Sequence, residues 1–135
     1  MSARHGPDPP GACADPALRI TTADLAGYTS VVCLEGEVDL GQRGLLQDAL
    51  ACALENGLQR LVVDLSRLVF CDCTGLNALL QTRLDAHACG IELVLAAPLP
   101  QTRRLLEISG TNEVFTIRPS VRAALPSAGA VPPAR

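Results

Sequence analysis

Aromatic side chains and concentrated positive charge are scarce in this sequence. Aromatic residues make up 2% of its 135 residues, tryptophan is absent, and the net charge is -3 with no basic stripe. Nucleic-acid-binding proteins typically present a basic surface, and those that bind single strands add aromatic residues for base stacking. The composition therefore argues against a nucleic-acid partner.

The sequence also lacks the long apolar runs of membrane and secretory segments. No run approaches the ~18 apolar residues of a transmembrane helix, and the first ten residues contain no apolar core of a signal peptide. The six cysteines are even in number, as in a disulfide framework, but several lie within strand-like or helix-like patterns, where reduced cysteine packs as a small apolar residue. We therefore expect a reduced, cytoplasmic protein without a membrane partner.

Aliphatic residues, by contrast, are abundant enough for one hydrophobic core. Apolar residues form 48% of the chain, and 135 residues suffice for a single domain. Residues 1–17 and 126–135 are rich in proline, alanine and glycine, and both segments are predicted to be flexible tails. The predicted domain covers residues 18–125.

The centre of this domain is the segment Leu61–Leu80, whose pattern changes halfway. Leu61–Leu65 is a short apolar run typical of a strand buried on both faces. The leucines after it have the spacing of one helix face: Leu76, Leu79, Leu80 and Leu84. Asp72 is a candidate N-cap of this helix, because its carboxylate can accept a hydrogen bond from an N–H group one turn in. The turn Phe70–Gly75 lies at the carboxyl end of a strand, where sites form in α/β sheets.

The remaining patterns predict strands that alternate with helices. Strands are expected at 18–22, 28–34, 91–96 and 114–117, and helices at 41–56, 73–89, 100–109 and 120–125, with a polar loop at 35–40. A short turn at 24–27 predicts a hairpin between the first two strands, whereas the alternation after it favours parallel strands joined by right-handed crossovers. The predicted fold class is therefore α/β, a mixed sheet with about four helices packed on it.

Three motifs stand out along this predicted fold. They are Leu34-Glu-Gly-Glu-Val-Asp39 before a helix, Asp64-Leu-Ser66, and Phe70-Cys-Asp-Cys-Thr-Gly-Leu76 at the start of the next helix. Together they resemble the STAS domain, and most of all its stand-alone bacterial form, the anti-sigma factor antagonist. The resemblance covers about residues 18–125.

The resemblance implies a protein-binding switch, not an enzyme, and it implies no cofactor and no metal. Antagonists of this family bind an anti-sigma factor that is also a serine kinase of the histidine-kinase-like ATPase fold, and this binding releases a sigma factor. Phosphorylation of the serine after the motif aspartate breaks the complex. The partner-binding residues that the resemblance implies are Glu37, Asp39, Asp72, Cys73, Thr74, Gly75, Leu76, Asn77 and Gln81.

The sequence departs from the family pattern at the position of the phosphorylated serine. Cys73 occupies that position, and a thiol is not a substrate for a serine kinase; Thr74 follows, where the family has a second serine. Two outcomes stay open: Thr74 accepts the phosphate, or the protein is a constitutive antagonist or scaffold without phosphorylation. A phosphate on Thr74 would add about -1.5 to -2 charges beside Asp72.

Other cysteines and polar residues have alternative interpretations. Cys73 at a helix N-terminus is a candidate redox-sensitive thiol, although the sequence shows no base for a thiol enzyme. Asp64 is expected to accept hydrogen bonds from backbone N–H groups in the next loop, and Gly75 is expected to permit close packing. A zinc site is disfavoured because its two pairs of candidate ligands lie a full helix, some 20 Å, apart: Cys71 with Cys73, and His87 with Cys89.

Overall fold

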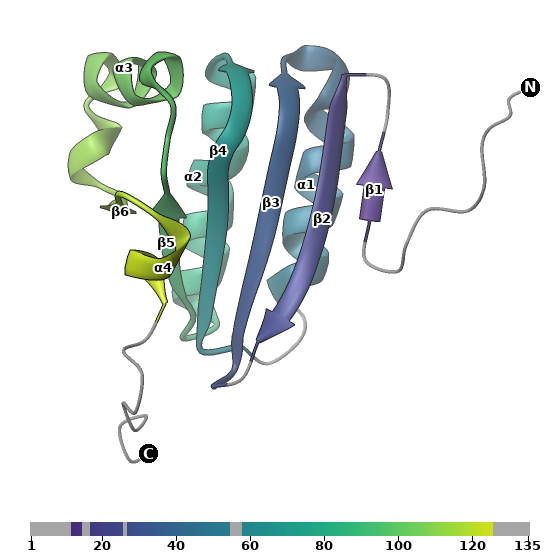
Figure 1. The fold of residues 1–135 in the computed structure, drawn as a ribbon, viewed down its shortest axis with the longest axis vertical. Helices are drawn as coiled ribbons and strands as arrows, with labels where there is room; N and C mark the ends of the chain where they lie inside the picture. The colour runs from purple at the N-terminus through teal and green to yellow at the C-terminus, as the bar shows by residue number, and fades with distance from the viewer. Residues whose placement is uncertain (1–11, 15–16, 26, 55–57, 126–135) are drawn as a thin grey trace, which may run out of the picture.

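The computed structural model describes residues 12–14, 17–25, 27–54 and 58–125. These residues form one six-stranded sheet, in which the strands lie side by side in sequence order (Figure 1). The strands are β1 (Ala12–Ala14), β2 (Leu18–Leu25), β3 (Thr29–Val38), β4 (Arg60–Cys71), β5 (Glu92–Ala96) and β6 (Thr116–Arg118). The β1–β2 and β2–β3 pairs are antiparallel, and the pairs from β3 to β6 are parallel. The sheet is mixed, as the sequence predicts.

Four α-helices accompany the sheet in the described part of the chain. They are α1 (Arg43–Leu54), α2 (Cys73–Ala88), α3 (Pro100–Ser109) and α4 (Val121–Ala124), and two short 3-10 helices, η1 (Leu40–Gln42) and η2 (Thr111–Glu113), precede α1 and follow α3. Figure 1 shows α1 and α2 behind the sheet, α4 in front of it, and α3 beyond the end of β5. None of these described helices is long and apolar enough to cross a membrane.

The main hydrophobic core lies between the sheet and helices α1 and α2. The helix predicted at 41–56 packs on the sheet as α1, with Leu46 and Leu50 fully buried and Leu45 and Ala49 packed against the same cluster. A second, smaller cluster lies on the opposite face of the sheet under α4: Val62, Val94, Ala96 and Ala124. The sheet is therefore covered on both faces near β4 and β5.

Strands β3 and β4 are longer than the sequence patterns predict. The expected loop at 35–40 is wrong in its first part, since β3 continues to Val38, and β4 continues to Cys71 instead of ending near Leu65. Two register shifts in the β3–β4 pairing interrupt the alternation of side chains that marks a strand. Gly36 lies at one of them with φ of 117°, a conformation that favours glycine.

The termini of the predicted domain also differ. Ala12–Ala14 pairs with β2 as strand β1, although the sequence placed these residues in the tail 1–17. The predicted turn at 24–27 begins later, because β2 extends to Leu25. The last strand, β6, begins at Thr116, two residues after the predicted start. The other residues of both predicted tails, apart from Ala17, lie outside the described residues, and so does the predicted end of the helix at 41–56.

One leucine of the predicted helix face is instead exposed. Leu84 is 58% exposed. Leu84 follows Leu76 by eight residues, which turns it about 80° further around the helix axis than two full turns. This rotation moves Leu84 out of the buried stripe of α2 and onto the same side as Asn77.

Candidate partner-binding surface

The paired carboxyl ends of β3 and β4 bring the two motif aspartates to one edge of the sheet. Val38 lies opposite Cys71 in the parallel register, and the Asp72 N–H donates to the Val38 carbonyl at 3.2 Å. Asp39 and Asp72 are therefore the first residues after two neighbouring strands. The sequence predicted each residue near a helix start, and the sheet register places the two starts side by side.

Both aspartates cap the helical segments that they precede. The Asp72 carboxylate accepts hydrogen bonds from the backbone N–H groups of Thr74 at 2.8 Å and Gly75 at 3.3 Å. The predicted N-cap of α2 is confirmed. Asp39 caps η1, where its carboxylate accepts from the Gly41 N–H at 2.9 Å and the Gln42 side chain accepts from the Asp39 N–H at 2.9 Å.

Gly75 permits close contact between α2 and the sheet. A Cβ atom at this position would lie 2.6 Å from the Cys71 Sγ and 2.9 Å from the Val38 Cγ1. These distances are far below van der Waals contact, so a larger residue would push α2 away from β3 and β4. The predicted packing role of Gly75 is confirmed, and it fixes where the first turn of α2 sits.

The residues implied by the STAS resemblance differ in their exposure. Asp72 and Thr74 are half-buried, while Gly75 and Leu76 are buried and offer a partner little side-chain surface. The exposed residues of the set are Glu37, Asp39, Cys73, Asn77 and Gln81. The Gln81 amide donates to the Asp85 carboxylate at 3.0 Å along the same helix.

Three exposed apolar residues that the sequence analysis did not place on the partner-binding surface lie beside this set. Leu40 directly follows Asp39 and is 70% exposed, and Phe70 pairs with Glu37 across the sheet and is 39% exposed. Leu84 continues the exposed side of α2. We call the combined group the carboxyl-edge surface: Glu37, Asp39, Leu40, Phe70, Asp72, Cys73, Thr74, Asn77, Gln81 and Leu84. A sequence signal existed for Leu40, which is an apolar residue in the predicted polar loop at 35–40, outside every predicted strand and helix.

The two cysteines of the turn have different environments. Cys71 is 2% exposed, and burial, followed by the charge of Asp72 and the neighbouring Cys73, raises the pKa of its thiol from 9.0 to about 12. A buried neutral thiol of this kind is a weak nucleophile. Cys73 is exposed in the first turn of α2. Any thiol chemistry of this surface therefore falls to Cys73.

The remaining candidate ligands and acids lie apart from this surface. Among the described residues, no group of three or more His, Cys, Asp and Glu side chains comes together as a metal site. Cys71 and Cys73 lie at the start of α2 and His87 and Cys89 at its end, a 16-residue helix of about 24 Å. Asp64 accepts from the Ser66 N–H at 3.0 Å, although Ser66 lies within β4 and not in a loop.

Comparison with known families identifies this arrangement of strands, caps and turn. A family model described as the STAS domain matches residues 20–124. The chain belongs to the STAS domain family. The match includes all four described helices and the sheet from Ile20 of β2 to β6, so the motifs that the sequence analysis singled out lie within the matched region, whereas β1 lies outside it.

Individual relatives agree with this family. The chain is 33% identical over 107 residues to BtrV of Bordetella bronchiseptica, provisionally named an anti-sigma factor antagonist, and the match covers 79% of this chain and 91% of BtrV. It is similar to an anti-sigma factor antagonist from Mycobacterium paratuberculosis, with a TM-score of 0.71, 26% identity and coverage of 83% and 95% of the two chains. The phosphorylated Bacillus protein SpoIIAA shares the fold, with a TM-score of 0.58, 21% identity and coverage of 73% and 89%.

Proposed function

We propose that this STAS protein is an anti-sigma factor antagonist that binds its anti-sigma factor through the carboxyl-edge surface. The observation that carries the proposal is the register of Val38 and Cys71, which sets two capping aspartates and an exposed thiol at adjoining helix starts. The names of BtrV and the mycobacterial structure support the same function. The protein acts by binding, without turning over a substrate.

The carboxyl-edge surface has the chemistry of a protein-binding site. Leu40 and Phe70 expose apolar area next to carboxylates, and apolar anchors surrounded by polar groups are typical of the centre of protein interfaces. The carboxylates of Glu37, Asp39 and Asp72 form no ion pair within the described residues. We expect a partner face that offers basic groups to these carboxylates and apolar groups to the leucine and phenylalanine.

The finer identity of the partner follows from the STAS resemblance. The proposed partner is an anti-sigma factor of the histidine-kinase-like ATPase fold, and its capture frees a sigma factor. Both partners act on transcription, so the proposed compartment is the cytoplasm. The free thiols of the described chain, which include the exposed Cys52, Cys73 and Cys89, suit a reducing compartment.

A second candidate function is constitutive antagonism without phosphorylation. Cys73 holds the exposed position at which the family carries its serine, while Thr74 is half-buried. The N–H groups of Thr74 and Gly75, which would otherwise stabilise a phosphate at the helix N-terminus, are already bonded to the Asp72 carboxylate. A phosphothreonine at this position would therefore meet a negative charge in place of free donors.

The binding proposal is tested by capture and titration with full-length protein. Tagged wild type, Asp72→Asn and Asp48→Ala are compared for retention of an ATPase-fold anti-sigma factor from the native host, and dissociation constants are then measured by calorimetry. Asparagine caps helices as well as aspartate does, so Asp72→Asn removes the charge and keeps the cap. Asp48 is an exposed carboxylate of α1 outside the carboxyl-edge surface.

We expect Asp48→Ala to bind as wild type does and Asp72→Asn to bind at least tenfold more weakly, about 1.4 kcal/mol. Absence of any ATPase-fold anti-sigma factor among the captured proteins would refute the proposed function. Equal affinity of all three proteins would place the binding site elsewhere on the domain.

The choice between switched and constitutive antagonism is made by mass spectrometry after incubation with the captured kinase and ATP. Cys73→Ser is the positive control, because it supplies a hydroxyl at the exposed position. Phosphate on Cys73→Ser and none on wild type supports the constitutive antagonist. Phosphate on Thr74 of the wild type rules it out, and its loss in Thr74→Val confirms the site.

A further inference from the structure

Strand β4 continues past the end of its neighbour β5. The β4–β5 pairing stops at Asp64 and Ala96, while β4 runs on to Cys71. The chain leaves the sheet after Ala96 because Ala97 turns it with φ of 55°, and the prolines at 98 and 100 have no N–H to extend a ladder. Helix α3 then begins and contacts β4 where β5 is missing.

Gln101 of α3 forms the hydrogen bonds that a neighbouring strand would form with the end of β4. Its side-chain oxygen accepts from the Cys71 N–H at 2.9 Å, and its side-chain nitrogen donates to the Cys71 carbonyl at 3.0 Å. The next N–H, that of Asp72, points to Val38 on the β3 side. The two backbone groups of Cys71 therefore face the side without a strand, and Gln101 satisfies both of them.

We infer that Gln101 is a positioning residue that sets the Cys71–Thr74 turn from helix α3. The Gln101 side-chain amide forms hydrogen bonds with the N–H and the carbonyl of Cys71. The residue that follows Cys71 is Asp72, which caps α2. Without this contact the N–H and carbonyl of Cys71 lose their partner, and the end of β4 keeps only the bond from the Asp72 N–H to the Val38 carbonyl. The consequence for partner binding rests on the proposed function, whereas the effect on the turn does not.

The inference is tested by amide hydrogen exchange on full-length protein, with Gln101→Ala and the control Arg104→Ala. Both residues are exposed on α3, and alanine favours the helix, so both variants should fold. We expect Gln101→Ala to speed exchange of the Cys71 amide about three- to tenfold, the usual worth of one hydrogen bond. The core Val63 amide and the Arg104→Ala protein should exchange as in the wild type.

A second variant separates hydrogen bonding from general support of the helix. In Gln101→Glu at pH 7 the carboxylate can accept from the Cys71 N–H, but it faces the Cys71 carbonyl without a proton to donate. As the pH falls through the glutamate pKa of about 4.3, the protonated side chain regains its donor. We expect the Cys71 and Asp72 amides of this variant to return toward wild-type protection at low pH.

The wild type measured over the same pH range controls for the other groups that face Gln101. Asp72 is the neighbouring carboxylate in the turn, and the Cys71 thiol stays protonated throughout because its pKa is raised to about 12. Arg103 and Arg104 are the charged residues of α3 nearest to Gln101 in the sequence. Unchanged exchange of the Cys71 amide in Gln101→Ala overturns the inference, as does a Gln101→Glu protein without this pH response.

Affinity for the captured anti-sigma factor then shows whether the positioned turn matters for binding. We expect Gln101→Ala to weaken binding by about three- to tenfold, in proportion to the lost hydrogen bond, and Arg104→Ala to leave it unchanged. If exchange is faster but affinity is unaltered, Gln101 orders the turn without affecting partner binding. The proposed function is then tested by the Asp72 variant alone. Failure of the wild type to bind refutes the proposed function, and the exchange data still decide the role of Gln101.

Discussion

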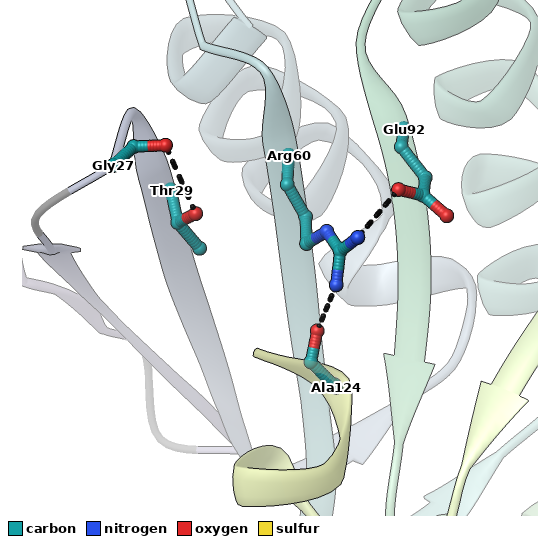
Figure 2. A network of polar contacts seen from close by, with 5 residues as sticks. All are labelled: Gly27, Thr29, Arg60, Glu92 and Ala124. Atoms are coloured by element: carbon teal, nitrogen blue, oxygen red, sulfur yellow. Dashed lines mark hydrogen bonds and ion pairs between the residues drawn. The ribbon is translucent and has the colours of Figure 1, made fainter. Parts of the chain in front are cut away.

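The two ends of strand β4 are held in different ways. At its amino end, the Arg60 guanidinium donates to the Ala124 carbonyl at 2.6 Å and forms an ion pair with Glu92 at 2.8 Å, which ties α4 and β5 to the strand (Figure 2). Thr29, opposite Arg60 in the register, donates to the Gly27 carbonyl in the same view. At the carboxyl end, two hydrogen bonds from the Gln101 side chain and two to the Asp72 carboxylate hold the strand and the turn.

The amino end of β4 therefore contributes to the stability of the fold, and the carboxyl end contributes to partner binding as well. The polar groups of the amino end are paired with groups of the same chain, and α4 covers the sheet beside them. The carboxyl end is ordered by caps and by Gln101, yet it leaves the carboxylates of Glu37 and Asp39 and the apolar Leu40 exposed. Substitutions at the amino end should therefore change stability alone, and those at the carboxyl end should change binding as well.

The largest expected effect on stability concerns Cys71 at high pH. The folded pKa of its thiol lies above the unfolded value, so the unfolded chain loses the proton first as the pH rises. This thiol does not lower the free energy of unfolding below about pH 9. Above that pH the free energy of unfolding falls by about 1.4 kcal/mol per pH unit, and the total loss is roughly 4 kcal/mol as the pH approaches 12. Urea unfolding of wild type and Cys71→Ala from pH 8 to 10.5 should show a steeper loss in the wild type. The prediction is contradicted if the free energies of unfolding of the two proteins change in parallel with pH.

Gly75→Ala should cost about 1–3 kcal/mol of unfolding free energy, because the added methyl collides with the Cys71 Sγ and the Val38 side chain. Gly44→Ala in α1 is the matched control, since its new Cβ would meet no atom within 4 Å apart from its chain neighbours and the backbone of its own helix, and it should be neutral or stabilising by up to about 1 kcal/mol. Combining Gly75→Ala with Cys71→Ala should recover part of the loss. Equal melting temperatures for the two glycine variants would show that α2 tolerates the shift.

Asp72→Ala should cost about 1 kcal/mol, the usual value of a helix N-cap, because the Thr74 and Gly75 N–H groups lose their acceptor. Asp72→Asn should keep most of the stability and lose partner affinity. Chemical denaturation and calorimetric titration of the two variants would separate the cap from the charge. A large loss of stability in Asp72→Asn would assign both effects to the carboxylate charge.

The smallest expected effect is at the amino end. The Arg60–Glu92 pair is partly exposed, with side chains 26% and 50% exposed, so a double-mutant cycle should give a coupling of about 0.2–1 kcal/mol that decreases with salt. Partner affinity should not change in either single variant. A change in affinity at this end would remove the distinction between the two ends of β4.

The sequence predicted most elements because their signals are local. Helix α3 begins at Pro100 and ends at Ser109 as predicted, since proline favours the first helical position and Gly110 supplies the left-handed stop with φ of 79°. The Asp72 cap was also readable, because its acceptors and donors lie within three residues of each other. The STAS family itself followed from short motifs around such local features.

Contacts between distant segments were not readable in the same way. The Gln101 bonds to Cys71 span 30 residues, and nothing in the helix pattern of α3 marks this side chain. The exposure of Leu84 depends on which side of α2 packs on the sheet, and the extension of β3 to Val38 depends on register shifts against β4. Each of these features is a property of two packed elements.

The sequence by itself determined the order of strands and helices from β2 onward, the Asp72 cap and the family, because backbone conformation and capping depend on residues close in the chain. Only the tertiary structure decided which residues share the carboxyl-edge surface. That surface arises where two parallel strands end together and a third strand stops short, so its composition is set by sheet register and by the helix that replaces the missing strand.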